Sequence, residues 1–68
     1  MNKNLLNSVM AKFGDNQSKL AKLLGISLSR VNAKINENNA QFTQSEIAEI
    51  RRHYHLSPDD VMEIFFVP

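Results

Sequence analysis

The chain has 68 residues, 43% hydrophobic and 22% charged, which is enough for one small domain, placed at residues 1–68, with a modest core. It has no cysteine, which excludes a disulfide framework and a thiolate metal site, and no apolar run approaches the roughly 20 residues that cross a bilayer. The net charge of +1 is unevenly distributed: residues 1–36 carry six basic side chains and one acidic, and residues 37–68 carry two basic and six acidic. A basic half of this kind is typical of polyanion binding.

A stripe of apolar residues at helical spacing predicts a first helix that is stopped by Gly14. The stripe follows the pattern i, i+1, i+4, i+5, i+8 and consists of Leu5, Leu6, Val9, Met10 and Phe13.

The second predicted helix follows Asn16, a plausible N-cap, and begins at Gln17. Its middle holds a small residue, Ala21, where another helix would have to cross closely. Gly25 falls where this helix ends and where the backbone is expected to need a positive φ, which a residue without a Cβ adopts at low cost.

A third helix is predicted directly after the turn. Ile26 is the apolar residue that closes the turn, Ser27 can cap the new helix, and Val31 and Ile35 give it an inner face. Together, residues 17–36 have the layout of a helix-turn-helix, whose second helix enters the major groove of DNA.

Two further helices are predicted from their N-terminal signals. Thr43 with Glu46 forms a capping box for a fourth helix that runs to about Tyr54. Ser57 followed by Pro58 starts a fifth helix that runs to about Phe66, with aspartates at its positive end. Five short helices and no convincing strand predict an all-α fold.

The outer face of the third helix carries small and hydrogen-bonding side chains that could contact base edges. Arg30 suits guanine, Asn32 suits adenine, and Ala33 suits a thymine methyl group, with Ser29 on the same surface. Leu28 leaves two alternatives open, because its spacing favours the core while its place in the first turn favours a base contact.

Phosphate contacts are expected from groups around this helix. Gln17 begins a helix, where free N–H groups attract an anion, and Asn36 and Asn39 lie just beyond the third helix. Three lysines are expected to add non-specific attraction to DNA: Lys19, Lys22 and Lys34.

The remaining polar groups are interpreted as structural. His53 and His55 are two residues apart on a helix and so point apart, and Asp59 and Asp60 are explained by capping. We expect no metal, no cofactor, no small-molecule substrate and no enzymatic activity, because no nucleophile–base pair or phosphate-binding glycine loop is present.

The pattern Gln17-x-x-Leu20-Ala21-x-x-Leu24-Gly25-Ile26-Ser27-x-Ser29-x-Val31-x-x-x-Ile35-Asn36 resembles the lambda-repressor-like family of phage Cro and repressor domains. The resemblance covers nearly the whole chain, and the segment from Leu56 to Phe66 is similar to small prophage regulators of low-GC Gram-positive bacteria. It implies a compact five-helix domain that binds an operator as a dimer and controls transcription.

Position by position, the resemblance implies phosphate contacts by Gln17, Asn36 and Asn39. It also implies base reading by Leu28 and Ser29, with Asn32 on the next turn. Leu28 departs from the family, in which many members have glutamine there, and Glu37 replaces a frequent glycine.

The preferred interpretation is a Cro-like repressor that reads a two-fold symmetric operator as a homodimer in the bacterial cytoplasm. The expected dimer contacts are Met62, Phe66 and Val67, because one helix face cannot bury the apolar run at the C-terminus; the alternative is that these side chains close the monomer core over the first helix. Two other functions stay open: an antitoxin-like autoregulator whose acidic half binds a toxin, and an antirepressor that acts only through protein contacts.

Overall fold

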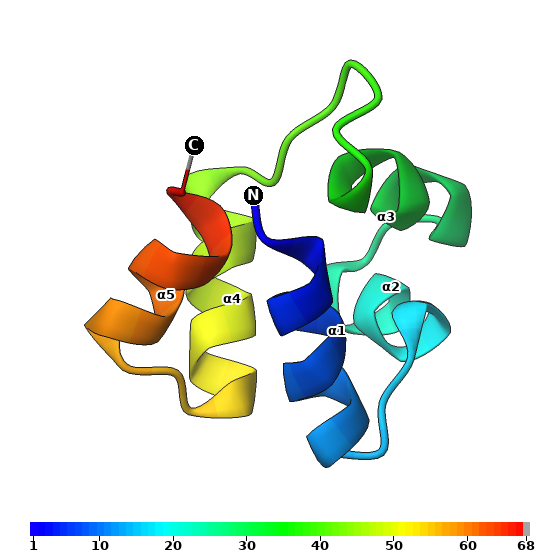
Figure 1. Ribbon diagram of the computed structural model, residues 1–68. Helices are drawn as coiled ribbons and strands as arrows, with labels where there is room; N and C mark the ends of the chain where they lie inside the picture. Colours follow the sequence, from blue (N-terminus) through cyan, green and yellow to red (C-terminus); the bar gives the residue numbers. More distant parts are fainter. Residues whose placement is uncertain (68) are drawn as a thin grey trace.

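The computed structural model describes residues 1–67, and Pro68, the last residue of the predicted domain, lies outside the described residues. All of its regular secondary structure is helical, which confirms the predicted all-α class. The helices are α1 (Lys3–Lys12), α2 (Gln17–Leu24), α3 (Leu28–Ile35), α4 (Gln44–Tyr54) and α5 (Pro58–Phe65). Figure 1 shows α1 in the middle, with α4 and α5 on one side and α2 and α3 on the other.

Each of the four predicted N-caps accepts a hydrogen bond from the N–H three residues ahead. Asn16, Ser27, Thr43 and Ser57 accept these bonds at 3.0 to 3.2 Å. Such a cap stabilises a helix by about 1 kcal/mol, because it satisfies an N–H that has no partner within the helix. The capping box of Thr43 and Glu46 is confirmed.

The structure adds the cap of α1, which the sequence did not predict, and the geometry by which Asp60 caps α5. Asn2 caps α1 by accepting from the N–H of Leu5 at 3.0 Å. Asp60 completes a second capping box, because its carboxylate accepts from the N–H of Ser57 at 3.0 Å. That backbone bond, together with the Ser57 hydroxyl, holds the pKa of Asp60 below its ordinary value.

The turn between α2 and α3 has the geometry expected from Gly25. This glycine lies in the left-handed region, with φ 69° and ψ 30°. The N–H groups of Gly25 and Ile26 both donate to the carbonyl oxygen of Ala21, which closes the turn. Ala21 itself is buried, and α2 and α3 make the most extensive contact between any two of the described helices.

The core receives side chains from every helix. Its fully buried members lie on α1, α2, α3, α4 and α5 in turn: Leu6, Leu20, Val31, Ile50 and Ile64. Phe13 differs from the sequence-based expectation, because it is 48% exposed at the end of the α1 stripe and packs edge-on against Tyr54, with ring centres 5.1 Å apart.

Asp15 ties the loop before α2 to the end of α4. Its Oδ2 accepts from the Tyr54 hydroxyl at 2.8 Å and lies 3.2 Å from Nε2 of His53. The Tyr54 hydrogen bond is the main cause that holds the pKa of Asp15 below its ordinary value of 3.8. The same carboxylate and the burial of the ring raise the pKa of Tyr54.

Asp15 should therefore contribute to stability in a pH-dependent way. A carboxyl whose pKa is lowered by folding stabilises the protein above its unfolded pKa and loses that contribution as the pH falls through the folded value. We expect Asp15→Asn to unfold at a lower temperature than wild type at pH 7, with the difference shrinking as the pH falls below 3.8. Thermal unfolding between pH 2 and pH 7 measures this, with Tyr54→Phe as a matched variant that keeps the aromatic packing. A constant difference across this range would contradict the assigned role.

Candidate nucleic-acid interface

Helix α3 has a buried side and an exposed side that differ sharply in chemistry. Val31 is 0% and Ile35 is 3% exposed, whereas Ser29, Arg30 and Asn32 are exposed. Three of the predicted base-reading residues therefore share a solvent-facing surface at the first two turns of the helix. Ala33, which was predicted to face outward with them, is half-buried.

Leu28 belongs to this exposed surface and not to the core. It is the first residue of α3, and it is 49% exposed. The alternative in which Leu28 packs into the core is therefore wrong in this structure. The first turn of α3 presents an apolar side chain directly beside the polar ones.

A chain of side-chain hydrogen bonds links α3 to α1 and α2. We call its members, Lys3, Gln17, Asn32 and Asn36, the polar row. Nδ2 of Asn32 donates to Oε1 of Gln17 at 3.4 Å, and Nδ2 of Asn36 donates to Oδ1 of Asn32 at 3.3 Å and to its backbone carbonyl at 3.0 Å. Nζ of Lys3 donates to Oδ1 of Asn36 at 3.3 Å.

The polar row sets which atoms of these amides stay free. Gln17 accepts within the row through its oxygen, so its amide nitrogen is the group left to donate to a phosphate. Both the oxygen and the nitrogen of the Asn32 amide are engaged within the row. Each of these amides has two N–H donors and two acceptor positions on its oxygen, so Asn32 keeps one donor and one acceptor position for a base edge.

Lys3 is a candidate DNA contact that sequence reasoning missed. Its ammonium lies at the C-terminal end of α3, beside Asn36, although the two residues are 33 positions apart in the chain. No local pattern relates the start of α1 to the end of α3, so only the excess of lysine in residues 1–36 pointed toward it.

The expected lysines fall into two groups. Lys19 and Lys22 are exposed on α2 and are available to a polyanion. Lys34 differs from the sequence-based expectation, because it is only 6% exposed. Its Nζ donates to Oε1 of Glu46 at 2.7 Å and to the carbonyl of Gln41 at 3.2 Å, so its charge is used inside the protein and is not available to a phosphate.

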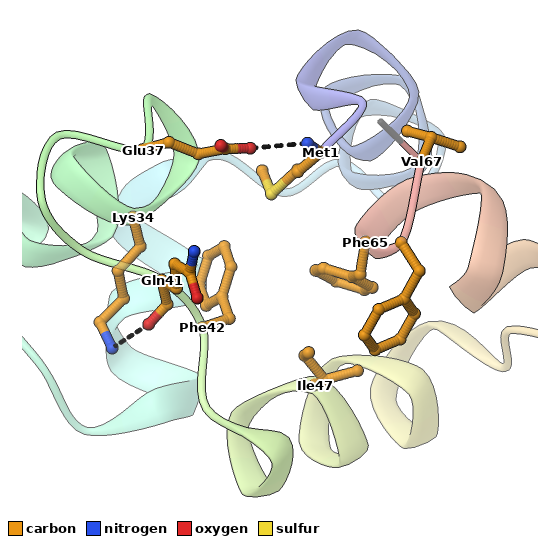
Figure 2. Close-up of a pocket in the computed structure, with 9 residues that line it drawn as sticks. Met1, Lys34, Glu37, Gln41, Phe42, Ile47, Phe65 and Val67 are labelled. Atoms are coloured by element: carbon orange, nitrogen blue, oxygen red, sulfur yellow. Dashed lines mark hydrogen bonds and ion pairs between the residues drawn. The ribbon is translucent and has the colours of Figure 1, made fainter.

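The loop that follows α3 has an unusual backbone. Glu37 and Asn39 both have φ 54°, and the N–H of Asn38 donates to the carbonyl of Ala33 at 2.9 Å. Asn36 and Asn39 are exposed there, as the phosphate prediction requires. The Glu37 carboxylate pairs with the Met1 amine at 2.6 Å (Figure 2).

The other polar groups have structural partners or stand apart from one another. His53 contacts Asp15, and within residues 1–67 no three His, Cys, Asp or Glu side chains gather as a metal site would require. In the same part of the chain, no helix has the length and apolar character needed to cross a membrane.

Comparison with known families agrees with this geometry. Residues 5–66 match the model of the Cro/C1-type HTH DNA-binding domain. No curated protein and no solved structure gave a significant match. The chain belongs to the Cro/C1-type helix-turn-helix family, which confirms the resemblance to lambda-repressor-like domains, and it is a DNA-binding regulator by class.

Proposed function

We propose that this protein is a Cro-like phage or prophage repressor that acts in the bacterial cytoplasm, on the nucleoid when bound. It binds a two-fold symmetric operator as a homodimer, with α3 in the major groove. The observation that carries this proposal is the two-sided character of α3, the second helix of the helix-turn-helix. Val31 on its inner side is fully buried, while Ser29 and Arg30 on its outer side are exposed, and the family of the chain binds DNA.

The proposed contacts divide by chemistry. Base edges are read by Arg30, Ser29, Leu28 and Ala33, with Asn32 contributing through the donor and acceptor positions that the polar row leaves free. Phosphates are bound by a wider set that carries no sequence information. That set is Lys3, Gln17, Lys19, Lys22, Asn36 and Asn39.

The first experiment is selection of duplexes from a random library by the wild-type protein, followed by sequencing. An enriched, symmetric site is the expected result. If no sequence is enriched and no salt-dependent DNA binding is found, the repressor proposal fails and the antirepressor alternative is favoured. A toxin gene beside the coding gene would favour the autoregulator alternative.

Arg30 and Lys22 should behave differently on the selected duplex. Arg30→Ala should cost about 1–3 kcal/mol at one base position, because a bidentate contact to guanine is lost. Lys22→Ala should weaken binding to selected and random duplexes alike and lower the slope of log affinity against log salt by roughly 1. Titrations at several salt concentrations measure both. Equal losses on both duplexes for Arg30→Ala would argue against base reading by Arg30.

Leu28 should read a thymine methyl group, since it is exposed at the first turn and has no hydrogen-bonding atom in its side chain. Replacing thymine by uracil removes only that methyl. At one position of the selected duplex, wild type should lose about fourfold in affinity, the equivalent of one buried methyl group. Leu28→Ala should be indifferent to the same replacement. A wild-type protein that tolerates uracil at every position would contradict this role.

The C-terminal apolar side chains support the proposed homodimer. Met62 is 57% and Phe66 is 58% exposed, whereas Phe65 packs edge-on against Phe42 with ring centres 5.9 Å apart. Phe65, Phe66 and Val67 line an open hollow of about 330 Å³ (Figure 2). In an isologous dimer, the same surface of both copies would bury these side chains against each other.

Phe66→Lys tests that interface. The substitution places a charge where an apolar contact is proposed, so we expect the variant to sediment as a monomer and to bind the symmetric duplex more weakly. Sedimentation at micromolar concentration, with and without the selected duplex, measures this. A dimeric Phe66→Lys protein would place the interface elsewhere, and a wild type that stays monomeric on the duplex would remove the dimer from the proposal.

A further inference from the structure

Lys34 is the one charged side chain that is buried among the described residues. It lies in the last turn of α3 and is held by groups from outside that helix. Its ammonium contacts the carboxylate of Glu46 at 2.7 Å and the carbonyl of Gln41 at 3.2 Å, and it lies 5.9 Å from the centre of the Phe42 ring. Figure 2 shows Lys34 beside Gln41 and Phe42, under the loop that leaves α3.

The carboxylate that Lys34 contacts is itself part of a helix cap. Oε1 of Glu46 accepts from the backbone N–H of Thr43 at 2.8 Å as well as from Lys34. Partial burial alone would raise the pKa of Glu46, but the bonds from Lys34 and Thr43 outweigh it and hold that pKa below the ordinary value. A single oxygen therefore joins the last turn of α3 to the first turn of α4.

The Lys34 ammonium also holds the segment between these two helices through a hydrogen bond to its backbone. It bonds the backbone at Gln41, near the end of a loop whose residues Glu37 and Asn39 have left-handed backbones. That loop carries Asn36 and Asn39, which the proposed function assigns to phosphate. The bonds of Lys34 therefore fix α3 and its following loop relative to α4.

Stability alone does not account for a lysine at this position. A buried ion pair loses much of its Coulomb energy to desolvation, and an apolar pair of similar volume is often equally stable or more stable. What the charged pair adds is a directional contact that admits one relative placement of its two helices.

We propose that Lys34 is a positioning residue for DNA recognition: with Glu46, it holds α3 and the loop of Asn36 and Asn39 in the arrangement that fits an operator. This inference rests on the proposed function of sequence-specific DNA binding. It assigns Lys34 no contact with DNA, in contrast to the exposed lysines Lys19 and Lys22.

The test compares the double variant Lys34→Met/Glu46→Gln with wild type. Methionine keeps the length of the side chain without its charge, and glutamine at position 46 can still complete the capping box with Thr43. Lys12→Met is the matched control, because Lys12 is an exposed lysine at the far end of α1. Each protein is titrated with the duplex selected by wild type and with a random duplex, below its unfolding temperature and at several salt concentrations.

We expect the double variant to bind the selected duplex about tenfold more weakly and to bind the random duplex within about twofold of wild type. Its salt slope on the random duplex should stay at the wild-type value, because Lys34 neutralises no phosphate and the loop residues Asn36 and Asn39 are uncharged. Lys12→Met should match wild type in its preference for the selected duplex. Lys34→Arg, which keeps the charge, should retain most of that preference.

Three outcomes would overturn the proposal. One is a folded double variant with wild-type preference for the selected duplex, which would make the pair purely structural. Another is a fall of the salt slope by about 1, which would make Lys34 a phosphate contact. The third applies if the double variant does not fold. Folded Lys34→Arg is then compared with wild type, and a loss of its preference for the selected duplex would contradict the proposed role of the charge. Failure of wild type to enrich any duplex would instead refute the proposed function on which this inference rests.

Discussion

The turn between α2 and α3 carries the constraint on which the DNA-binding surface depends. Gly25 takes φ 69° there, and two successive N–H groups donate to the Ala21 carbonyl. A Cβ atom at position 25 would meet no atom within 4 Å, so the requirement for glycine lies in the backbone conformation and not in space. Once this turn is set, Val31 and Ile35 face the core and the exposed side of α3 is determined.

The two ends of α3 are held by different kinds of interaction. Its N-terminus is held locally, by Ser27 as cap and by the turn, both within a few residues. Its C-terminus is held by long-range polar contacts: Lys34 to α4 on the buried side, and Asn36 to Lys3 of α1 on the exposed side. The candidate DNA interface is thus supported from α1, α2 and α4, while α5 lies apart from it (Figure 1).

The acidic half of the chain is partly used for folding. Glu46 completes the cap of α4 and neutralises Lys34, and Asp60 completes the cap of α5. Asp15, the one acidic residue of the basic half, is turned toward Tyr54 and His53. These carboxylates satisfy backbone and side-chain donors within the protein, so part of the uneven distribution of charge along the sequence is explained by folding.

The sequence by itself determined the helices, the caps of α2 to α5 and the turn, because each of these depends on residues three or four positions apart. Asn16, Ser27, Thr43, Ser57 and Gly25 were predictable for that reason. Only the tertiary structure decided the environment of Leu28, Lys34 and Lys3. Helical spacing favoured the core for Leu28, and Lys34 was expected to attract DNA. The packing of the helices decided otherwise: Leu28 is exposed, and Lys34 is buried against Glu46, 12 residues away. Periodicity reports the direction of a side chain around its own helix axis, whereas burial depends on which other helices are packed there.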